Sequence, residues 1–194
     1  LDEGEIFNMY HEVPSVAAKA EWALRNTALL EDPTFTTETP EKAQAFLKNL
    51  ICYYGVMEGL FFYCGFTQIL SMGRRNKMTG VAEQFQYIMR DESMHTNFGV
   101  DVINTIIQEN PHLWTAEFQQ EVIEAIKEAV DIEITYAHDS MPKGILGMNA
   151  VQMTHYLHTI ANRRLQQFGL PAQYNPPENP FPWMAEMLDI RKEK

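Results

Sequence analysis

One stretch of 24 residues limits the fold more than any other part of the chain: residues 49–72 read NLICYYGVMEGLFFYCGFTQILSM and contain a single charge, Glu58. Its length would allow a membrane span. However, three glycines, three tyrosines and a glutamine dilute its hydrophobicity, and no basic flank marks a topology. A helix that is apolar on all sides also suits the centre of a helical bundle. We therefore predict a buried central helix rather than a membrane helix.

Helical patterns cover nearly all of the chain, and no segment has a convincing strand pattern. Pro14 is expected to kink or break the first helix, and Gly169 suits the left-handed turn that closes the last one. Thr39 is followed by a proline and an early glutamate, which indicates a helix start. Helices are expected over about residues 3–30, 39–73, 81–110, 115–140 and 149–168. The predicted fold class is therefore all-α, a helical bundle.

The expected organisation is one domain over residues 1–194, since a chain of 194 residues fits one domain or a large piece of one. Residues 170–194 are proline-rich and carry apolar anchors, so they are expected to form an irregular strap over the bundle. Cys52 and Cys64 would lie about 18 Å apart on one helix, beyond disulfide reach. We interpret both cysteines as reduced packing residues.

The charge balance excludes one class of function. The chain has 26 acidic and 15 basic residues, a net charge of -11, and no Lys/Arg cluster longer than two. A phosphate backbone would be repelled, so we do not expect nucleic-acid binding. The start, LDEGEIFNMYHEVP, has neither the basic leader nor the apolar run of a signal peptide, which predicts a cytoplasmic protein.

Glu58 is the residue that the expected core explains least well, because an ionised carboxylate there costs several kcal/mol unless a cation or donor meets it. It could be paired with an arginine or held protonated. The next helix offers another explanation, since Glu92 and His95 are spaced i, i+3 and project from one face. Two carboxylates and an imidazole are half of the ligand set of a di-metal bundle protein.

Other pairs with similar spacing are poorer candidates. Glu109 and His112 are separated by Asn-Pro at a helix end, where no shared face is maintained, and we interpret this pair as chance. His155 and His158 have no nearby carboxylate in the sequence and are interpreted as packing or solvent-facing residues. His11 and His138 have no partner that the sequence identifies.

Four segments together resemble a known family: YYGVMEGLFFYCGF, EQFQYIMRDESMHTNFGVDVINTIIQENPHLW, MPKGILGMN and NPFPWM. They are similar to the second half of the small, radical-generating subunit of class I ribonucleotide reductase, closest to its chlamydial-type, manganese/iron branch. The resemblance implies a ferritin-like bundle with a dinuclear Fe/Fe or Mn/Fe centre, and it puts Glu58, Glu92 and His95 at three metal-ligand positions. It also implies a homodimer of complete subunits and a large-subunit partner on which ribonucleotides are reduced.

The resemblance assigns further roles around these ligands. Asp91 matches a carboxylate of the radical-transfer route, which in the family links a metal-bound histidine to a tryptophan. Phe62, Phe66 and Ile88 match the lining of the apolar pocket around the radical site, although ordinary core packing explains them equally well.

The sequence departs from the family in offering half of the ligands, since a complete site takes four carboxylates and two histidines. The subunit could be split or truncated, with the missing amino-terminal half supplying the rest. Two copies could instead meet about a two-fold axis and assemble a symmetric site. The chain could also be a metal-free remnant or interaction module, or a ferritin-like oxidase without a reductase partner.

Overall fold

The computed structural model describes residues 2–188, so residues 189–194 of the expected strap lie outside the described residues. The described part is all-α, as predicted, with an isolated bridge between Ile145 and Met148 as its one β feature. Its α-helices are α1 (Glu3–Glu12), α2 (Pro14–Thr27), α3 (Pro40–Leu50), α4 (Tyr63–Gly73), α5 (Thr79–Glu109), α6 (Ala116–Ser140) and α7 (Ala150–Gln167). Shorter turns of helix are η1 (Ala28–Glu31), η2 (Ile51–Met57), η3 (Pro111–Leu113) and η4 (Pro182–Leu188).

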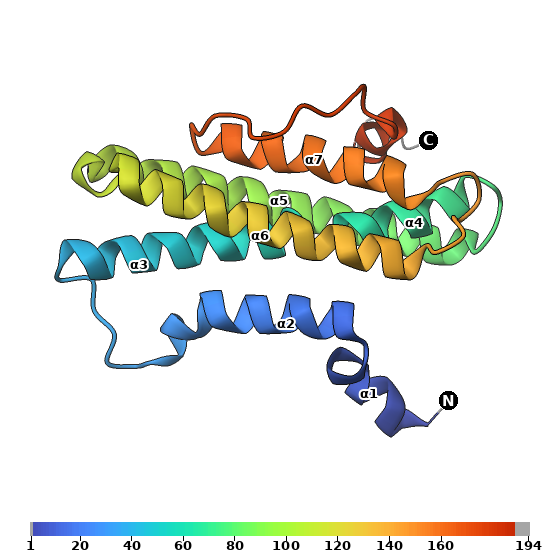
Figure 1. The fold of residues 1–194 in the computed structure, drawn as a ribbon, viewed down its shortest axis with the longest axis horizontal. Coiled ribbons are helices and arrows are strands. Elements are labelled where there is room, and N and C mark those ends of the chain that lie inside the picture. Colours follow the sequence, from blue (N-terminus) through green and yellow to red (C-terminus); the bar gives the residue numbers. More distant parts are fainter. Residues whose placement is uncertain (1, 189–194) are drawn as a thin grey trace.

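The long helices α5 and α6 both run along the length of the bundle (Figure 1). α4 packs on α5, α7 packs on α6 from one side, and α2 packs on α6 from the other. After α7 the chain turns back and follows that helix, so that the carboxyl-terminal segment covers its outer side (Figure 1). The side chain of Asn162 fixes this return, because it donates to the carbonyl of Tyr174 and accepts from the backbone N–H groups of Gln173 and Tyr174.

The helix boundaries follow the local chemistry that the sequence indicated. Val13 is extended and Pro14 opens α2, which separates α1 from α2. The Thr39 side chain accepts from the N–H of Lys42 at the start of α3. Gly169 has a φ of +73° directly after α7, as expected for a residue in a left-handed helix-ending turn.

The expected continuous helix over residues 39–73 is wrong in one respect. The segment Ile51–Met57 is a π-helix, and residues 58–62 form a turn before α4 resumes. The N–H of Glu58 donates to the carbonyl of Tyr53, five residues back, and the Val56 carbonyl accepts from both Leu60 and Phe61. Each hydrogen-bonded turn thus contains one residue more here than a turn of an α-helix. Such wide turns occur often at functional sites.

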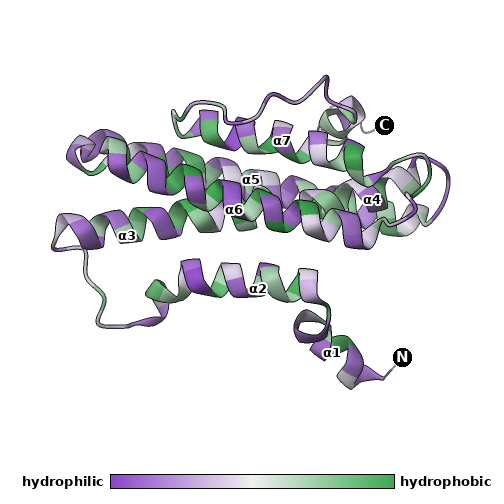
Figure 2. Cartoon of the chain, viewed as in Figure 1, coloured by the Kyte–Doolittle hydropathy of each residue, from purple (hydrophilic) through white to green (hydrophobic). Residues whose placement is uncertain are grey.

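The core lies between α2 and the helices that follow it, and most of its residues are apolar. Trp22 is buried and packs its ring edge-on against Phe61, with 5.3 Å between ring centroids. Green, hydrophobic residues alternate with purple ones along the long helices, which is the pattern of helices with one buried face (Figure 2). Cys52 and Cys64 are buried and free, and burial raises the pKa of their thiols to about 12 and about 11. Both are packing residues, as predicted.

Residues 49–72 are mostly buried, but one side of this segment is open. Tyr53 and Phe62 are 39% and 41% exposed. On the neighbouring α5, the side chains of Ile88, Met94 and Phe98 are exposed as well. None of the helices within residues 2–188 combines the length and hydrophobicity that a membrane crossing requires.

Candidate metal centre

Glu58 lies directly after the π-helix, at the point where the backbone turns before α4. Its side chain is 13% exposed. Apolar residues flank Glu58 on both sides in the sequence, and its carboxylate is the single charged group of residues 49–72. It is directed toward α5, where the two other candidate residues lie.

Glu92 and His95 lie one turn apart on α5, and their side chains converge as the i, i+3 spacing predicts. Nδ1 of His95 is 3.0 Å from Oε2 of Glu92 and 3.6 Å from Oε2 of Glu58. One ligand atom from each of the three residues lies within 4.8 Å of the others. Among the described residues this is the one group of three or more such side chains close enough to share a metal ion.

Within this cluster, neighbouring side chains shift the pKa of Glu58 and of His95. Burial, followed by the hydrogen bond and charge of Glu92, raises the pKa of Glu58 to about 7, although His95 acts in the opposite direction. The pKa of His95 is raised in turn, chiefly by its contact with Glu92. Two carboxylates held this close repel each other unless a proton or a cation lies between them. Carboxylate oxygens with imidazole nitrogen are a donor set that suits iron or manganese.

The structure brings three of the predicted site residues together and leaves others outside the cluster. Asp91 precedes Glu92 on α5, is exposed and is not part of the group. Phe66 is buried and packs near Phe62, with 5.7 Å between ring centroids. Phe62 and Ile88 are 41% and 42% exposed, so the interpretation of both as ordinary core is wrong for this chain. The His95 side chain is exposed as well, at 56%.

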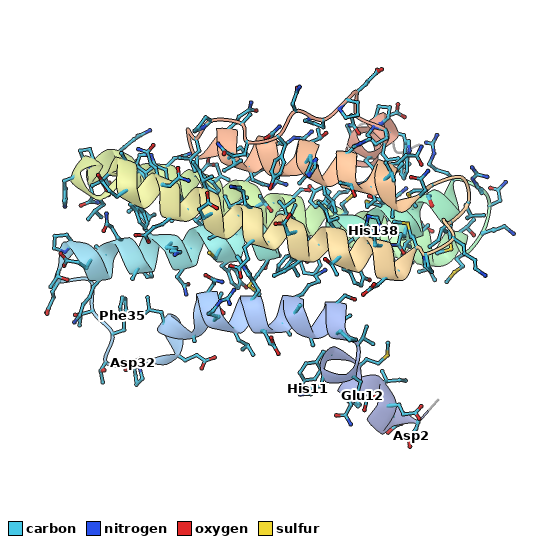
Figure 3. All side chains as sticks on the ribbon, viewed as in Figure 1. Asp2, His11, Glu12, Asp32, Phe35 and His138 are labelled. Atoms are coloured by element: carbon cyan, nitrogen blue, oxygen red, sulfur yellow. The ribbon has the colours of Figure 1, made fainter. Side chains whose placement is uncertain are left out.

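The remaining histidines take no part in the cluster. Figure 3 labels His11 on α1, away from the long helices, and His138 near the end of α6. The His158 ring stacks on Tyr174 with 4.2 Å between centroids, so it packs under the returning chain as a packing residue. α5 ends at Glu109 and His112 belongs to a short 3-10 turn, which agrees with a chance spacing.

The sequence reasoning missed two cations that contact the turn after Glu58, the half-buried Lys19 and the buried Arg164. Lys19 of α2 donates to the carbonyl of Phe61 at 2.6 Å and pairs with the buried Glu133 at 2.7 Å. Arg164 of α7 is 5% exposed and donates to the carbonyl of Gly59 at 2.9 Å, and burial lowers its pKa. A signal for Arg164 was present, because it follows Leu157 and Ile160 on the apolar face of α7 at helical spacing.

The fold and this cluster define the class of the protein: it is a ferritin-like helical bundle with a carboxylate–histidine cluster between its helices. Comparisons with known proteins give the family. Residues 1–180 match the model of the ribonucleotide reductase small chain family, and the chain belongs to this family.

Its relatives agree with that assignment. The chain is 50% identical over all of its 194 residues to the ribonucleoside-diphosphate reductase subunit beta of Chlamydia pneumoniae, covering 56% of that protein. It is 33% identical over 182 residues to the ribonucleoside-diphosphate reductase small chain 1 of Saccharomyces cerevisiae, covering 94% of this chain and 40% of the yeast protein. The chain thus spans about half the length of the curated relatives it matches.

Solved structures show the same fold. A putative class I ribonucleotide reductase from Bacillus halodurans superposes with a TM-score of 0.83 at 27% identity, covering 95% of this chain and 64% of the other. The ferritin-like bundle expected from the sequence is therefore confirmed.

Proposed function

We propose that this chain is the part of a ribonucleotide reductase small subunit that supplies half of the ligands of a dinuclear Fe/Fe or Mn/Fe centre. Glu58, Glu92 and His95 are the proposed ligands. The observation that carries the proposal is their convergence from two separate segments to within 4.8 Å, as the one group of three or more such side chains among the described residues that could share a metal ion. Residues 1–194 are then a partial ferritin-like domain, with residues 170–194 as its strap.

The chain's own residues would hold and shield such a centre. Glu58 and Glu92 would neutralise the positive charge, and the His95 imidazole would add a nitrogen ligand in its deprotonated form. Phe66, buried at 3% exposure, would keep water from one side. When bound, such a centre activates oxygen and supplies the oxidant that begins the reduction of ribonucleoside diphosphates to deoxyribonucleotides.

The open side of the cluster supports a second part of the proposal, which concerns the missing ligands. The His95 side chain is 56% exposed, and Phe62 and Ile88, the expected lining of the pocket, are 41% and 42% exposed. A shielded centre needs these side chains to be covered. We assign this covering to the amino-terminal half of a longer small subunit, which would bring the other ligands, because the curated relatives are about twice as long as this chain.

The proposed subunit has protein partners and a cellular location. The subunit would form a homodimer and would pass its oxidising equivalent to the large subunit, where the ribonucleotide is reduced. A cytoplasmic location and a role in DNA replication belong to this proposal. Asp91 is the proposed first relay toward the large subunit, because it is exposed on α5 directly beside the ligand Glu92.

A substitution of the relay separates a reductase from an oxidase. In the full-length protein, Asp91→Ala is expected to retain metal, since Asp91 is outside the cluster, and to lose ribonucleoside-diphosphate reduction with the large subunit. Glu83→Ala, an exposed carboxylate on the same helix, is the matched control and should keep both properties. The measurement is product formation beside metal content. Full reduction by Asp91→Ala would rule out the relay, and oxygen consumption without any reduction in the parent protein would favour an oxidase.

A further inference from the structure

The backbone that follows Glu58 lacks the usual helical partners. In the described residues, no backbone N–H group donates to the carbonyl of Gly59 or of Phe61. Tyr63, which would donate to Gly59 in a regular α-helix, donates to Leu60 instead. A buried carbonyl without a partner costs about 1–3 kcal/mol. The wide turn that directs Glu58 toward α5 therefore leaves two acceptors that side chains must satisfy.

Both acceptors are met by cations from other helices. Lys19 of α2 donates to Phe61. Arg164 of α7 donates from Nε to Gly59 at 2.9 Å and from a terminal nitrogen to the Tyr63 hydroxyl at 3.1 Å. One guanidinium thus binds the Gly59 carbonyl and the Tyr63 hydroxyl at the same time. A single ammonium group cannot do this with the same planar geometry.

The contact at Gly59 is too close for any side chain. A Cβ on this residue would lie 2.7 Å from Nε of Arg164 and 2.5 Å from the carbonyl oxygen of Gly55. Arg164 therefore reaches the backbone itself, one residue from Glu58. Besides Gly59 and Tyr63, Arg164 donates to the neutral side chain of Gln167 at 2.7 Å. Among the described residues, no carboxylate forms an ion pair with Arg164.

We infer that Arg164 is a positioning residue for Glu58: by holding the Gly59 carbonyl and the Tyr63 hydroxyl, it fixes the turn that aims the Glu58 carboxylate at Glu92 and His95. This inference rests on the proposed metal site. A charged guanidinium buried with neutral acceptors is costly to maintain. Orienting Glu58 is a function that would explain why a buried arginine is present at this position. Removal of a group that orients a metal ligand typically lowers metal affinity about 10- to 100-fold.

The test uses the full-length protein with its upstream region, loaded with Mn(II). Arg164→Gln is compared with Arg164→Lys and with Arg163→Gln, an exposed neighbour that serves as the matched control. Each variant is measured for Mn(II) affinity, for the electron paramagnetic resonance spectrum of bound Mn(II), and for helicity and Tm. Arg164→Gln is expected to fold, to bind Mn(II) about 10- to 100-fold more weakly and to change the spectrum. Arg164→Lys should recover part of the affinity, and Arg163→Gln should match the parent.

The outcomes separate this inference from the proposed function. A folded Arg164→Gln variant with parental affinity and spectrum overturns the positioning role but leaves the metal site standing. A lowered Tm with an unchanged spectrum shows a structural role alone and also overturns it. If Arg164→Gln does not fold, Tyr63→Phe replaces it, since this change removes one acceptor and leaves the arginine; parental affinity and spectrum there overturn the inference. A parent protein that binds no metal overturns both proposals.

Discussion

Replacing Glu92 by alanine should weaken metal binding by the full-length small subunit by at least about 100-fold. Glu92 contacts His95. After burial, it is also the main cause of the raised pKa of Glu58. Its loss removes one ligand and also the partner that orients the imidazole. Because removal of groups that merely orient ligands already lowers metal affinity about 10- to 100-fold, we expect a loss of at least about 100-fold. Metal content after gel filtration and a Mn(II) titration measure it.

Two controls make this result specific. Glu83→Ala changes the net charge by the same amount and removes a carboxylate from the same helix. However, Glu83 is exposed and lies outside the cluster. It should bind metal as the parent does. Equal affinity in the Glu92 variant and the parent would show that the cluster does not hold the metal.

The second large effect concerns folding rather than metal. Lys19→Met is expected to lower the free energy of unfolding by about 3–5 kcal/mol at pH 7.5, because it leaves a buried carboxylate without its cation. The Glu133 side chain is fully buried and lies 2.7 Å from the Lys19 ammonium. Urea denaturation followed by circular dichroism measures the change. The double variant Lys19→Met/Glu133→Leu should recover the part of the loss that comes from the unpaired charge, and retain the part that comes from the Phe61 carbonyl, which loses its donor in both variants.

An exposed ion pair between the same two helices is the matched control. Arg25 and Glu128 join α2 to α6 at 2.5 Å, but their side chains are 61% and 51% exposed. Arg25→Met should therefore cost less than about 1 kcal/mol. A loss of the same size in both variants would show that burial of the pair is not what matters.

The Lys19 effect should depend on pH in a defined direction. Burial raises the pKa of Glu133 from 4.5 to about 6 even with Lys19 present, and the lysine acts to lower it. The folded state therefore binds a proton more readily than the unfolded state, so the contribution of Glu133 to stability is largest below pH 4.5 and falls as the pH rises through 6. Without Lys19 this dependence becomes stronger. The cost of Lys19→Met should be smaller at pH 5 than at pH 7.5, and an equal cost at both values would contradict the assignment.

The sequence predicted the features that depend on local pattern. The apolar stretch around Glu58 indicated a bundle, Pro14 and Thr39 marked helix boundaries, and the i, i+3 spacing predicted that Glu92 and His95 would meet. These features follow from periodicity and capping, which a single sequence displays.

The features that were missed depend on contacts between distant residues. Arg164 and Gly59 are 105 residues apart, and Lys19 and Phe61 are 42 apart, so no local pattern joins them. The π-helix escaped prediction because apolar residues around a buried helix look alike whether its turns are α or π. The exposure of Phe62 followed neither from its hydrophobicity nor from its place in the central segment.

The central claim is that Glu58, Glu92 and His95 bind metal within a longer small subunit. The most direct measurement is anomalous diffraction at the iron and manganese edges from crystals of the full-length protein loaded with both metals. We predict two adjacent peaks, with all three side chains within bonding distance of at least one of them. Peaks at another position, or none near these side chains in fully loaded crystals, would contradict the account.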